Sequence, residues 1–427
     1  MRDGAPYVRL PCPDTMSWTC VRAPGPICVD PAVALPASTA STAIAAATNA
    51  LENPRTVPLC RSSGRRRPRP AQSSGDRSPP HPLKEGTPVG LRSIPSVEGT
   101  PPVGSGAMAA TRTYDFGTPV ELEPGILRVT LPLPSGPKHV HTYLVRDEDG
   151  WMLVDTGLGL PDPPWRAIAA TLDAPVVRIF VTHMHPDHVG GAEEASRVLG
   201  APVYQGRLDY AQCERVWGAD DWPERIAGWF LRNGVPKPVA DELIESGHVF
   251  ADFVRFAWNP TLVDPGDEIA GWRVVATPGH ADGHLCLLRD GILIAGDHVL
   301  TPITPAIGLY PDSRPDPLGD YLESLAAVEG LEPRIAYPGH REPIGDPHAR
   351  AEEIAEHHDE RLDRTESALG AEGRSGYDVS HDLFGRELAP IQRRFAVAEA
   401  LSHLERLVVL GRAGRADDGR VVTYTGS

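Results

Sequence analysis

Cysteine is scarce in this chain, which has 427 residues and six cysteines, and no two of them form a CxxC pair. Four lie within residues 1–107, where their spacing does not make a zinc-finger pattern, and Cys213 and Cys286 stand alone in the remainder. This usage, with no secretion signal, favours free thiols in a reducing cytoplasm. Cys286, in the apolar run HLCLL, is expected to be a small buried hydrophobic residue.

Long apolar runs are also lacking. Residues 32–51 are rich in alanine, but Pro36 and many serines and threonines argue against a membrane span. The arginine cluster at 65–69 is followed by polar sequence and not by an apolar core, so it does not fit a signal peptide. We therefore expect no association with a membrane.

The first 107 residues differ in composition from the rest of the chain. They are rich in Pro, Ser, Ala and Arg and hold 12 basic and 7 acidic residues, a net charge of +5. Because the whole chain has a net charge of −16, residues 108–427 carry −21. Such a low-complexity segment cannot bury enough apolar surface to offset the loss of chain entropy, so we expect disorder. The sequence turns globular at Met108. Either the natural protein starts near Met108 and residues 1–107 are a spurious extension, or they form a genuine disordered basic arm.

The segment VTHMHPDHVGG, residues 181–191, concentrates possible metal ligands. His183 and His185 alternate, so both side chains can converge on one point, and Asp187 and His188 come round the turn toward a second point. Imidazole and carboxylate are ligands of borderline divalent metals such as zinc. The apolar run 176–182 before them predicts a strand, and residues 191–200 after them predict a helix that stops at Gly200. This order is typical of an α/β active site.

Three later residues of ligand type each follow an apolar strand pattern. His280 ends TPGH after WRVVA, Asp297 closes GILIAGD, and His340 ends YPGH after RIAY. A lone histidine is more often structural, but three repeats of this pattern after a cluster of four favour one shared metal site.

These stretches resemble the metallo-β-lactamase superfamily, in the hydrolase branch that includes glyoxalase II type thioesterases. The similarity rests on VDTG (154–157), THMHPDH (182–188), TPGHADGH (277–284), AGDH (295–298) and PGH (338–340), and covers about residues 118–345. The resemblance implies an αββα sandwich. It also implies that His183, His185 and His280 bind a first metal, that Asp187, His188 and His340 bind a second, and that Asp297 bridges both. The cofactors would be two divalent ions, zinc in the first place, with iron or manganese as alternatives.

Charge counting indicates the reaction at such a centre. Two divalent ions stay partly uncompensated beside Asp187 and Asp297, and this positive field lowers the pKa of bound water and polarises a carbonyl oxygen. We therefore expect attack of metal-bound hydroxide on an acyl thioester or related ester, with Asp187 and Asp155 as catalytic residues. Asp155 would orient a ligand histidine, unless it only caps a turn before Gly157. His284 and His298 are either supporting or substrate-facing residues, or plain turn residues.

Residues 207–258 predict a helical insertion that holds nine of the 26 aromatic residues of the chain. Its place between the first ligand cluster and TPGH would put it over the metals. It is then a lid that binds an apolar acyl or aromatic group, or its rings form a separate small core or a dimer contact. The expected substrate-binding residues are Tyr210, Trp217, Trp229 and His284.

The expected catalytic domain, residues 108–348, is followed by a small α+β module at 349–427. Helical patterns at 350–369, 377–385 and 393–411 precede a hairpin around Asp418 and Gly419, an order that resembles a winged helix and the C-terminal domain of one subgroup of these hydrolases. Residues 350–427 hold 11 arginines against 15 acidic residues, so the basic surface that nucleic-acid binding needs is missing. Domain packing or a homodimer is the better use, and His357 and His358 are expected to face solvent.

Several activities fit these motifs. We expect a dinuclear metal-dependent hydrolase that acts on a small-molecule acyl substrate and not on nucleic acid. The alternatives are a nuclease or phosphodiesterase of the same superfamily, a mononuclear iron sulfur dioxygenase, and a β-lactamase or lactonase. The chain lacks room for the extra domain of the processing nucleases. The complete ligand set argues against a degenerate binding protein.

Overall fold

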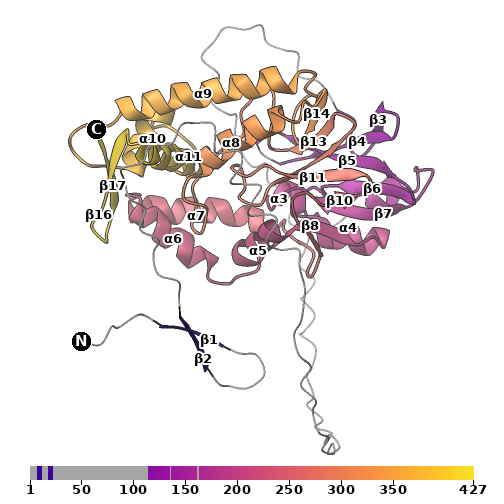
Figure 1. Cartoon of the computed structure of the whole chain (residues 1–427), viewed down its shortest axis with the longest axis horizontal. Helices are drawn as coiled ribbons and strands as arrows, with labels where there is room; N and C mark the ends of the chain where they lie inside the picture. Colours follow the sequence, from indigo (N-terminus) through magenta and orange to yellow (C-terminus); the bar gives the residue numbers. More distant parts are fainter. Residues whose placement is uncertain (1–6, 12–17, 23–113, 135, 161–162) are drawn as a thin grey trace, which may run out of the picture. The chain divides into compact units, whose positions relative to one another are not determined.

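The computed structural model describes residues 7–11, 18–22, 114–134, 136–160 and 163–427 (Figure 1). The chain divides into two units, Met1–Gly86 and Thr87–Ser427. In the first unit, β1 (Tyr7–Pro11) pairs antiparallel with β2 (Trp18–Arg22). The rest of the tail that we expect to be disordered, and the start expected near Met108, lie outside the described residues.

Two sheets form the centre of the second unit. The larger has seven strands in the sequence order of the chain, antiparallel from the first to the fourth and parallel from there on. They are β3 (Pro119–Glu123), β4 (Ile126–Pro132), β5 (His139–Asp147), β6 (Gly150–Val154), β7 (Val176–Val181), β8 (Val203–Gly206) and β9 (Thr261–Val263).

The smaller sheet has five strands, also in sequence order, and only its last pair is parallel. They are β10 (Glu268–Ile269), β11 (Trp272–Ala276), β12 (Leu285–Arg289), β13 (Ile292–Gly296) and β14 (Ile335–Pro338). The strands predicted from WRVVA, GILIAGD and RIAY are β11, β13 and β14.

Alternating side chains of both sheets explain the uninterrupted apolar sequence of several strands. In β6, Met152 and Val154 belong to the core between the sheets, while Trp151 and Leu153 belong to the core on the opposite face. Successive side chains of a strand point to opposite faces, so a strand covered on both sides needs apolar residues throughout. Strand β13 is buried at all of its positions for the same reason.

Helices cover the outer face of each sheet. Trp165 of α2 (Trp165–Ala169) and Ala195 of α4 (Ala192–Leu199) pack on the larger sheet. Tyr321 of α8 (Pro317–Glu329) and Ile354 of α9 (Pro347–Ser367) pack on the smaller one (Figure 1). Helix α4 ends before Gly200, which has φ 70°, as predicted. The expected αββα sandwich is confirmed.

The insertion is helical as predicted, with α5 (Arg207–Val216), α6 (Trp222–Arg232) and α7 (Lys237–Ala251). Helices α6 and α7 share a hydrophobic cluster with the C-terminal elements. Those elements are α10 (Gly376–Phe384), α11 (Pro390–Val409), β15 (Arg374–Ser375), β16 (Ala413–Asp417) and β17 (Val422–Gly426). The predicted hairpin is β16 and β17, and the C-terminal module packs against the insertion.

His358 corrects an expectation. It is buried in α9 instead of facing solvent, and its Nδ1 lies 3.2 Å from Nε2 of His403 on α11. The charged appearance of the α9 sequence hides the side that α11 covers. Among the described residues, the helices lack the combination of length and apolar character that a bilayer crossing demands.

Candidate metal centre

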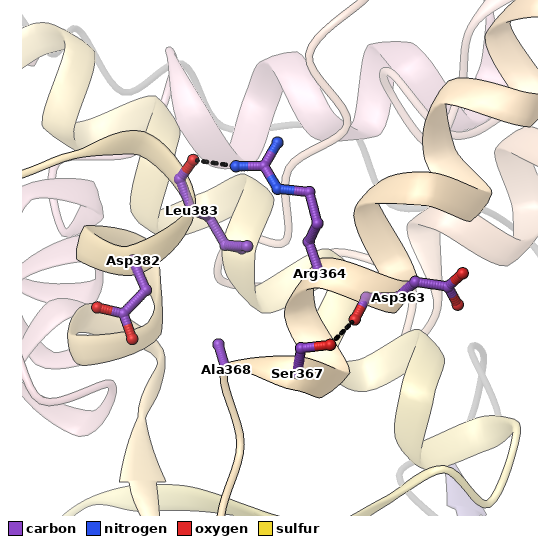
Figure 2. Close-up of a pocket in the computed structure, with 6 residues that line it drawn as sticks. All are labelled: Asp363, Arg364, Ser367, Ala368, Asp382 and Leu383. Carbon is purple, nitrogen blue, oxygen red and sulfur yellow. Dashed lines mark hydrogen bonds between the residues drawn. The ribbon is translucent and has the colours of Figure 1, made fainter.

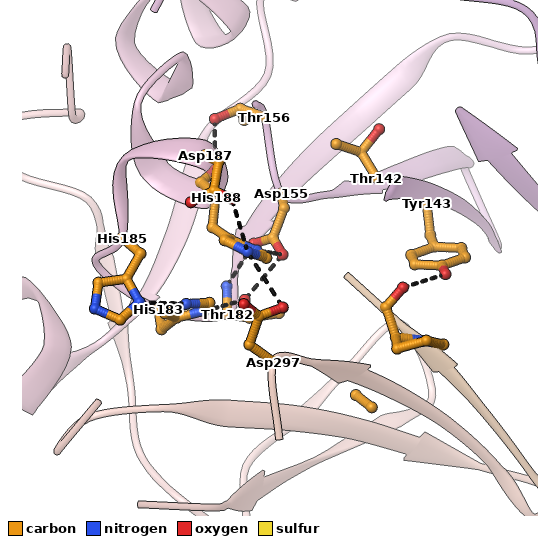
Figure 3. Close-up of polar contacts among 12 residues, drawn as sticks. Thr142, Tyr143, Asp155, Thr156, Thr182, His183, His185, Asp187, His188 and Asp297 are labelled. Atoms are coloured by element: carbon orange, nitrogen blue, oxygen red, sulfur yellow. Dashed lines mark hydrogen bonds and ion pairs between the residues drawn. The ribbon is translucent and has the colours of Figure 1, made fainter. Parts of the chain in front are cut away.

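The predicted ligands come together at one edge of the sandwich. Figure 3 shows His183, His185, Asp187, His188 and Asp297. His183 follows β7, Asp297 follows β13 and His340 follows β14, so strand ends of both sheets deliver them. Helix α3 (Pro186–Val189) starts directly after His185 and turns Asp187 and His188 back toward the same place. All seven predicted ligands belong to three overlapping groups whose ligand atoms lie within 4.8 Å of one another within each group.

The first group is formed by three imidazoles. Nδ1 of His185 lies 3.1 Å from Nε2 of His183 and 2.8 Å from Nε2 of His280. Two nitrogens bound tetrahedrally to one zinc ion lie about 3.3 Å apart, given Zn–N bonds of about 2.0–2.1 Å. The three rings are therefore close to the arrangement that one ion requires.

Asp297 lies between this group and the second one. Its Oδ2 is 3.6 Å from Nε2 of His280 and 3.3 Å from Nε2 of His340, and its Oδ1 is 3.4 Å from Nε2 of His188. Asp187 completes the second group, with Oδ2 at 3.3 Å from His340 Nε2 and 3.9 Å from His188 Nε2. This geometry lets Asp297 bridge two ions.

Hydrogen bonds at the other ring nitrogen orient three of the histidines. His280 Nδ1 donates to the carbonyl oxygen of Ala306, and His340 Nδ1 donates to that of His139, each at 2.8 Å. His188 Nδ1 lies 2.8 Å from Oδ2 of Asp155. A proton held at Nδ1 leaves the lone pair of Nε2 facing the centre, which is the form that binds a metal.

Asp155 organises this side of the centre through Thr182. Its Oδ1 accepts a hydrogen bond from the Thr182 N–H and its Oδ2 accepts one from the Thr182 hydroxyl, both at 2.8 Å. Because the Thr182 hydroxyl proton is donated to Asp155, Oγ1 of Thr182 accepts a hydrogen bond from Nδ1 of His183 at 3.0 Å. Asp155 thereby supports two candidate ligands, His188 directly and His183 through Thr182. This contact favours the orienting role over a simple turn cap, although Asp155 does have φ 62°.

Two buried atoms in the centre lack hydrogen-bond partners among the described residues. They are Nε2 of His188 and Oδ1 of Asp297. Buried polar atoms are almost always satisfied, because an unsatisfied one costs about 1–3 kcal/mol. A cation bound between them would satisfy both, so the residues present fit a metal ion.

The protonation of the first group also suits a metal. Burial lowers the pKa of His183 and of His280, and burial together with the nearby His280 lowers the pKa of His185 to about 3. These three imidazoles are therefore neutral near pH 7, and a metal ligand must be neutral imidazole.

The second group is governed by its carboxylates. Burial by itself would lower the pKa of His340, but Asp297 and Asp187 outweigh burial and raise it to about 10. Burial raises the pKa of Asp187, but the neighbouring His188 and His340 outweigh it and lower that pKa to about 2. Binding of a cation here would displace protons from imidazole.

Gly339 shows how tightly the chain passes the centre. A Cβ atom at this position would lie 2.6 Å from both Oδ1 of Asp297 and Cε1 of His188. Only a residue without a side chain leaves those two groups in place. The glycine of YPGH is thus required by a close approach.

The four expected substrate-binding residues do not form one site. Trp217 lies against the loop that carries His183 and His185, where its Nε1 donates to the Met184 carbonyl oxygen at 2.9 Å. Tyr210 packs edge-on to Phe256 beside the core of the larger sheet. Trp229 is a correction, because its ring stacks on Tyr310 in the cluster shared with the C-terminal helices.

His284 is a second correction. It is buried, its Nδ1 lies 2.7 Å from the Thr277 hydroxyl, and its Nε2 accepts from the backbone N–H of Asp297 at 3.1 Å. It therefore supports Asp297 from behind instead of facing substrate. His298 is buried too, and the Tyr321 hydroxyl donates to its carbonyl oxygen at 2.7 Å.

Asp209 of α5 also supports the centre, although no sequence motif predicts it. This buried carboxylate accepts from the backbone N–H of Met184 at 2.8 Å, between His183 and His185, and from Nε2 of Gln205 at 2.6 Å. It fixes the backbone that carries two candidate ligands. No local pattern marks it, since its partner lies 25 residues away.

A separate depression of about 440 Å³ lies between α9 and α10 (Figure 2). Its lining residues are Asp363, Arg364, Ser367, Ala368, Asp382 and Leu383. Arg364 reaches across it and donates to the carbonyl oxygen of Leu383 at 3.2 Å. None of the candidate metal ligands lines it, so it is distinct from the metal centre.

Comparison with known families supports the fold. Residues 135–340 match the model of the metallo-β-lactamase superfamily, and residues 362–426 match that of the metallo-β-lactamase-like C-terminal domain. The chain is 34% identical to a metallo-β-lactamase family protein of Thermus thermophilus, with a TM-score of 0.64 over 72% of this chain and 100% of that one. A β-lactamase domain protein of Burkholderia ambifaria is 29% identical, with a TM-score of 0.64 over 74% of this chain and 96% of that one.

Curated proteins show similarity as well. The probable metallo-hydrolase YqjP of Bacillus subtilis is 29% identical over 278 residues, which are 61% of this chain and 85% of that protein. The atrochrysone carboxyl ACP thioesterase of Emericella nidulans is 27% identical over 231 residues, which are 52% of this chain and 58% of that protein.

Proposed function

The chain belongs to the metallo-β-lactamase superfamily as one of its metallo-hydrolases, and we propose that its substrates are acyl thioesters or related acyl esters of small molecules. The similarity to the atrochrysone carboxyl ACP thioesterase carries the choice of a thioester. The convergence of the seven candidate ligands supports hydrolysis at that site.

The metal ions that we infer are two zinc ions. His183, His185 and His280 would hold the first, Asp187, His188 and His340 the second, and Asp297 both. When bound, they lower the pKa of a coordinated water and polarise the carbonyl oxygen of a substrate. The imidazole and carboxylate donors suit zinc, with iron or manganese as alternatives.

The chain itself supplies neither of its described thiols as a nucleophile. Cys213 and Cys286 are buried, and burial raises the pKa of Cys286 to about 12. A thiol held in this way carries no thiolate near pH 7. We propose that water is the attacking group: its oxygen bonds to the carbonyl carbon, the C–S bond breaks, and a carboxylic acid and a thiol result.

Asp187 is the residue best placed to handle the proton of that water. Its side chain is 21% exposed, against 8% for Asp297, so it is the candidate carboxylate ligand that faces incoming solvent. We propose that its carboxylate accepts a proton from the attacking water. Asp155 is buried behind His188 and acts by orienting that ring.

The test combines metal analysis of the purified protein with a hydrolysis panel of a thioester, a lactone, a β-lactam and a phosphodiester. We expect two zinc ions per chain and preference for the thioester. His183→Ala should lose metal and at least about a hundredfold in kcat/KM, because its ring belongs to the first group. His348→Ala is the matched control, since that histidine is 55% exposed and lies outside the centre.

The panel also separates the alternatives. Preferential phosphodiester turnover would indicate a nuclease, and preferential lactam or lactone turnover a lactamase or lactonase. One iron per chain together with oxygen consumption would indicate a sulfur dioxygenase. Each of these results would replace the thioesterase proposal.

A further inference from the structure

Two arginines beside the metal centre lack an acidic partner among the described residues. Arg128 of β4 is 8% exposed, and its Nε is buried without a hydrogen-bond partner. Arg341 directly follows the candidate ligand His340, and its Nε is likewise buried without one. A buried guanidinium nitrogen without a hydrogen-bond partner is costly, so the two Nε atoms call for an explanation.

Both guanidinium groups act on the same histidine. His139 of β5 has its pKa lowered to about 4, first by burial, then by His340, Arg341 and Arg128, while Glu342 acts in the opposite direction. Arg128 also contributes to lowering the pKa of His141, after burial. The contacts place these groups together: the Tyr114 ring centre lies 4.5 Å from that of His139 and 5.2 Å from the guanidinium carbon of Arg128, and the backbone N–H of Arg341 donates to Nε2 of His139 at 3.3 Å.

His139 adds a neutral donor to this point. Its Nε2 accepts from the backbone N–H of Arg341 at 3.3 Å, so the proton of the neutral ring is at Nδ1. No described residue accepts from that Nδ1–H. His141 differs, because its Nδ1 bonds the Thr130 hydroxyl at 3.0 Å and its Nε2 the Arg341 carbonyl oxygen at 2.8 Å. His141 thus holds the backbone at Arg341 in place, whereas the Nδ1–H of His139 has no acceptor among the described residues.

The backbone at Arg341 is in an unfavourable conformation. Its φ is 69°, in the left-handed region that favours glycine. Strained residues persist where the surroundings impose them, often beside functional sites. Arg341 keeps this unfavourable backbone conformation, and its guanidinium lies next to the candidate ligand His340 with an unpaired Nε. Binding of an anion by this guanidinium would explain why arginine stands here.

On the other side of Arg128 lies an aromatic wall. The guanidinium carbon is 5.2 Å from the centre of the Tyr114 ring, and the Tyr114 hydroxyl donates to Oε1 of Glu342 at 2.6 Å. The ring attracts the cation without neutralising it. Planar guanidinium groups bind carboxylate and phosphate in a bidentate manner.

We propose that Arg128, Arg341 and His139 form an anion-binding subsite that takes a carboxylate or phosphate group of the substrate, beside the reacting bond. The inference rests on the proposed hydrolytic function for the identity of the ligand as substrate. Anion binding at these three residues can be tested without any assumption about the reaction.

Direct binding to protein stripped of metal tests the subsite separately from hydrolysis. Calorimetric titration with inorganic phosphate and, in a second series, with acetate would measure affinity at fixed ionic strength. Stronger binding of phosphate points to a phosphorylated substrate, and stronger binding of acetate to a carboxylated one. Binding of neither would overturn the proposal, whatever the hydrolysis panel shows.

Arg341→Gly is the decisive variant, because glycine accepts the left-handed backbone while the guanidinium is lost. We expect about tenfold to a hundredfold weaker anion binding with unchanged or higher Tm. Arg341→Lys keeps the charge but loses the planar guanidinium, so it should lose less binding than Arg341→Gly. Arg128→Lys and Arg128→Met form a second pair, of which the methionine variant should lose more binding, because it also loses the charge.

Arg334→Gln is the matched control. That arginine is also near β14, but it pairs with Glu123, and its removal changes the net charge by the same amount. Equal losses in Arg334→Gln and Arg341→Gly would show a general charge effect and refute the subsite. Loss confined to the Arg341 and Arg128 variants would support it.

Discussion

Oδ2 of Asp155 lies 2.8 Å from Nδ1 of His188, and the same carboxylate binds both the N–H and the hydroxyl of Thr182. One residue at the end of β6 thus orients a candidate ligand of the second group and, through Thr182, one of the first. The contact couples the two halves of the centre through a residue that belongs to neither.

Asp155→Asn tests this coupling. The amide can still accept from the Thr182 N–H, but its NH2 would face the Nδ1–H of His188 and favour the other tautomer of that ring. We expect metal affinity to fall by about 10–100-fold, measured by competition with a chelator. Asp173→Asn, at an exposed carboxylate that binds Arg146, is the control. Unchanged affinity in Asp155→Asn would remove the orienting role.

Gly339→Ala tests the close approach of β14 to the centre. The added Cβ would meet Asp297 and His188 at 2.6 Å and push them apart. We expect loss of bound metal, measured by elemental analysis, and destabilisation by about 1–3 kcal/mol. Gly345→Ala, where a Cβ meets nothing within 4 Å, should retain the metal. Full metal content in Gly339→Ala would contradict this reading of the backbone.

Asp209 provides a test of how the ligand loop is held. Asp209→Ala leaves the buried N–H of Met184 without an acceptor and should lower the free energy of unfolding by about 1–3 kcal/mol. Asp209→Asn should cost less, because its carbonyl oxygen can accept from Met184. The Gln205 amide can also rotate its Oε1, which now lacks a partner, toward the new NH2. Denaturant unfolding would measure both, and equal losses would refute the argument.

The buried pair of His358 and His403 predicts a pH dependence of stability. Burial lowers the pKa of His358 to about 2 and that of His403 to about 3. The folded state keeps them neutral while the unfolded chain takes up protons below about pH 6.5. Stability is therefore present above that pH and is lost as the pH falls toward the folded pKa values.

His358→Gln removes one of these two contributions. Between pH 7 and pH 5 the wild type should lose about 2 kcal/mol more than the variant. Urea unfolding at the two pH values gives the difference directly. Equal losses in both proteins would show that His358 takes up its proton in the folded state.

The predictable part of the fold is the part in which local pattern and burial agree. The apolar run of β13 and the strand before His183 are recognisable because both faces of those strands are covered. The helices of the insertion were also predictable, but not that α6 and α7 pack against the C-terminal helices. Trp229 looked like a substrate contact, because its sequence context does not say that α11 and Tyr310 pack against it.

The sequence by itself determined the candidate ligands. They follow apolar strands in short, recognisable turns, and the ends of these strands meet at one edge of the sandwich. The tertiary structure alone decided which side chains surround them. Asp209 binds Met184, His284 lies behind Asp297, and the backbone N–H of Arg341 donates to His139 although about 200 positions separate them. Such contacts join distant strands and helices, and no local periodicity encodes a partner that far along the chain. The chemistry of the centre is therefore local in the sequence, while its supporting and substrate-facing groups depend on packing.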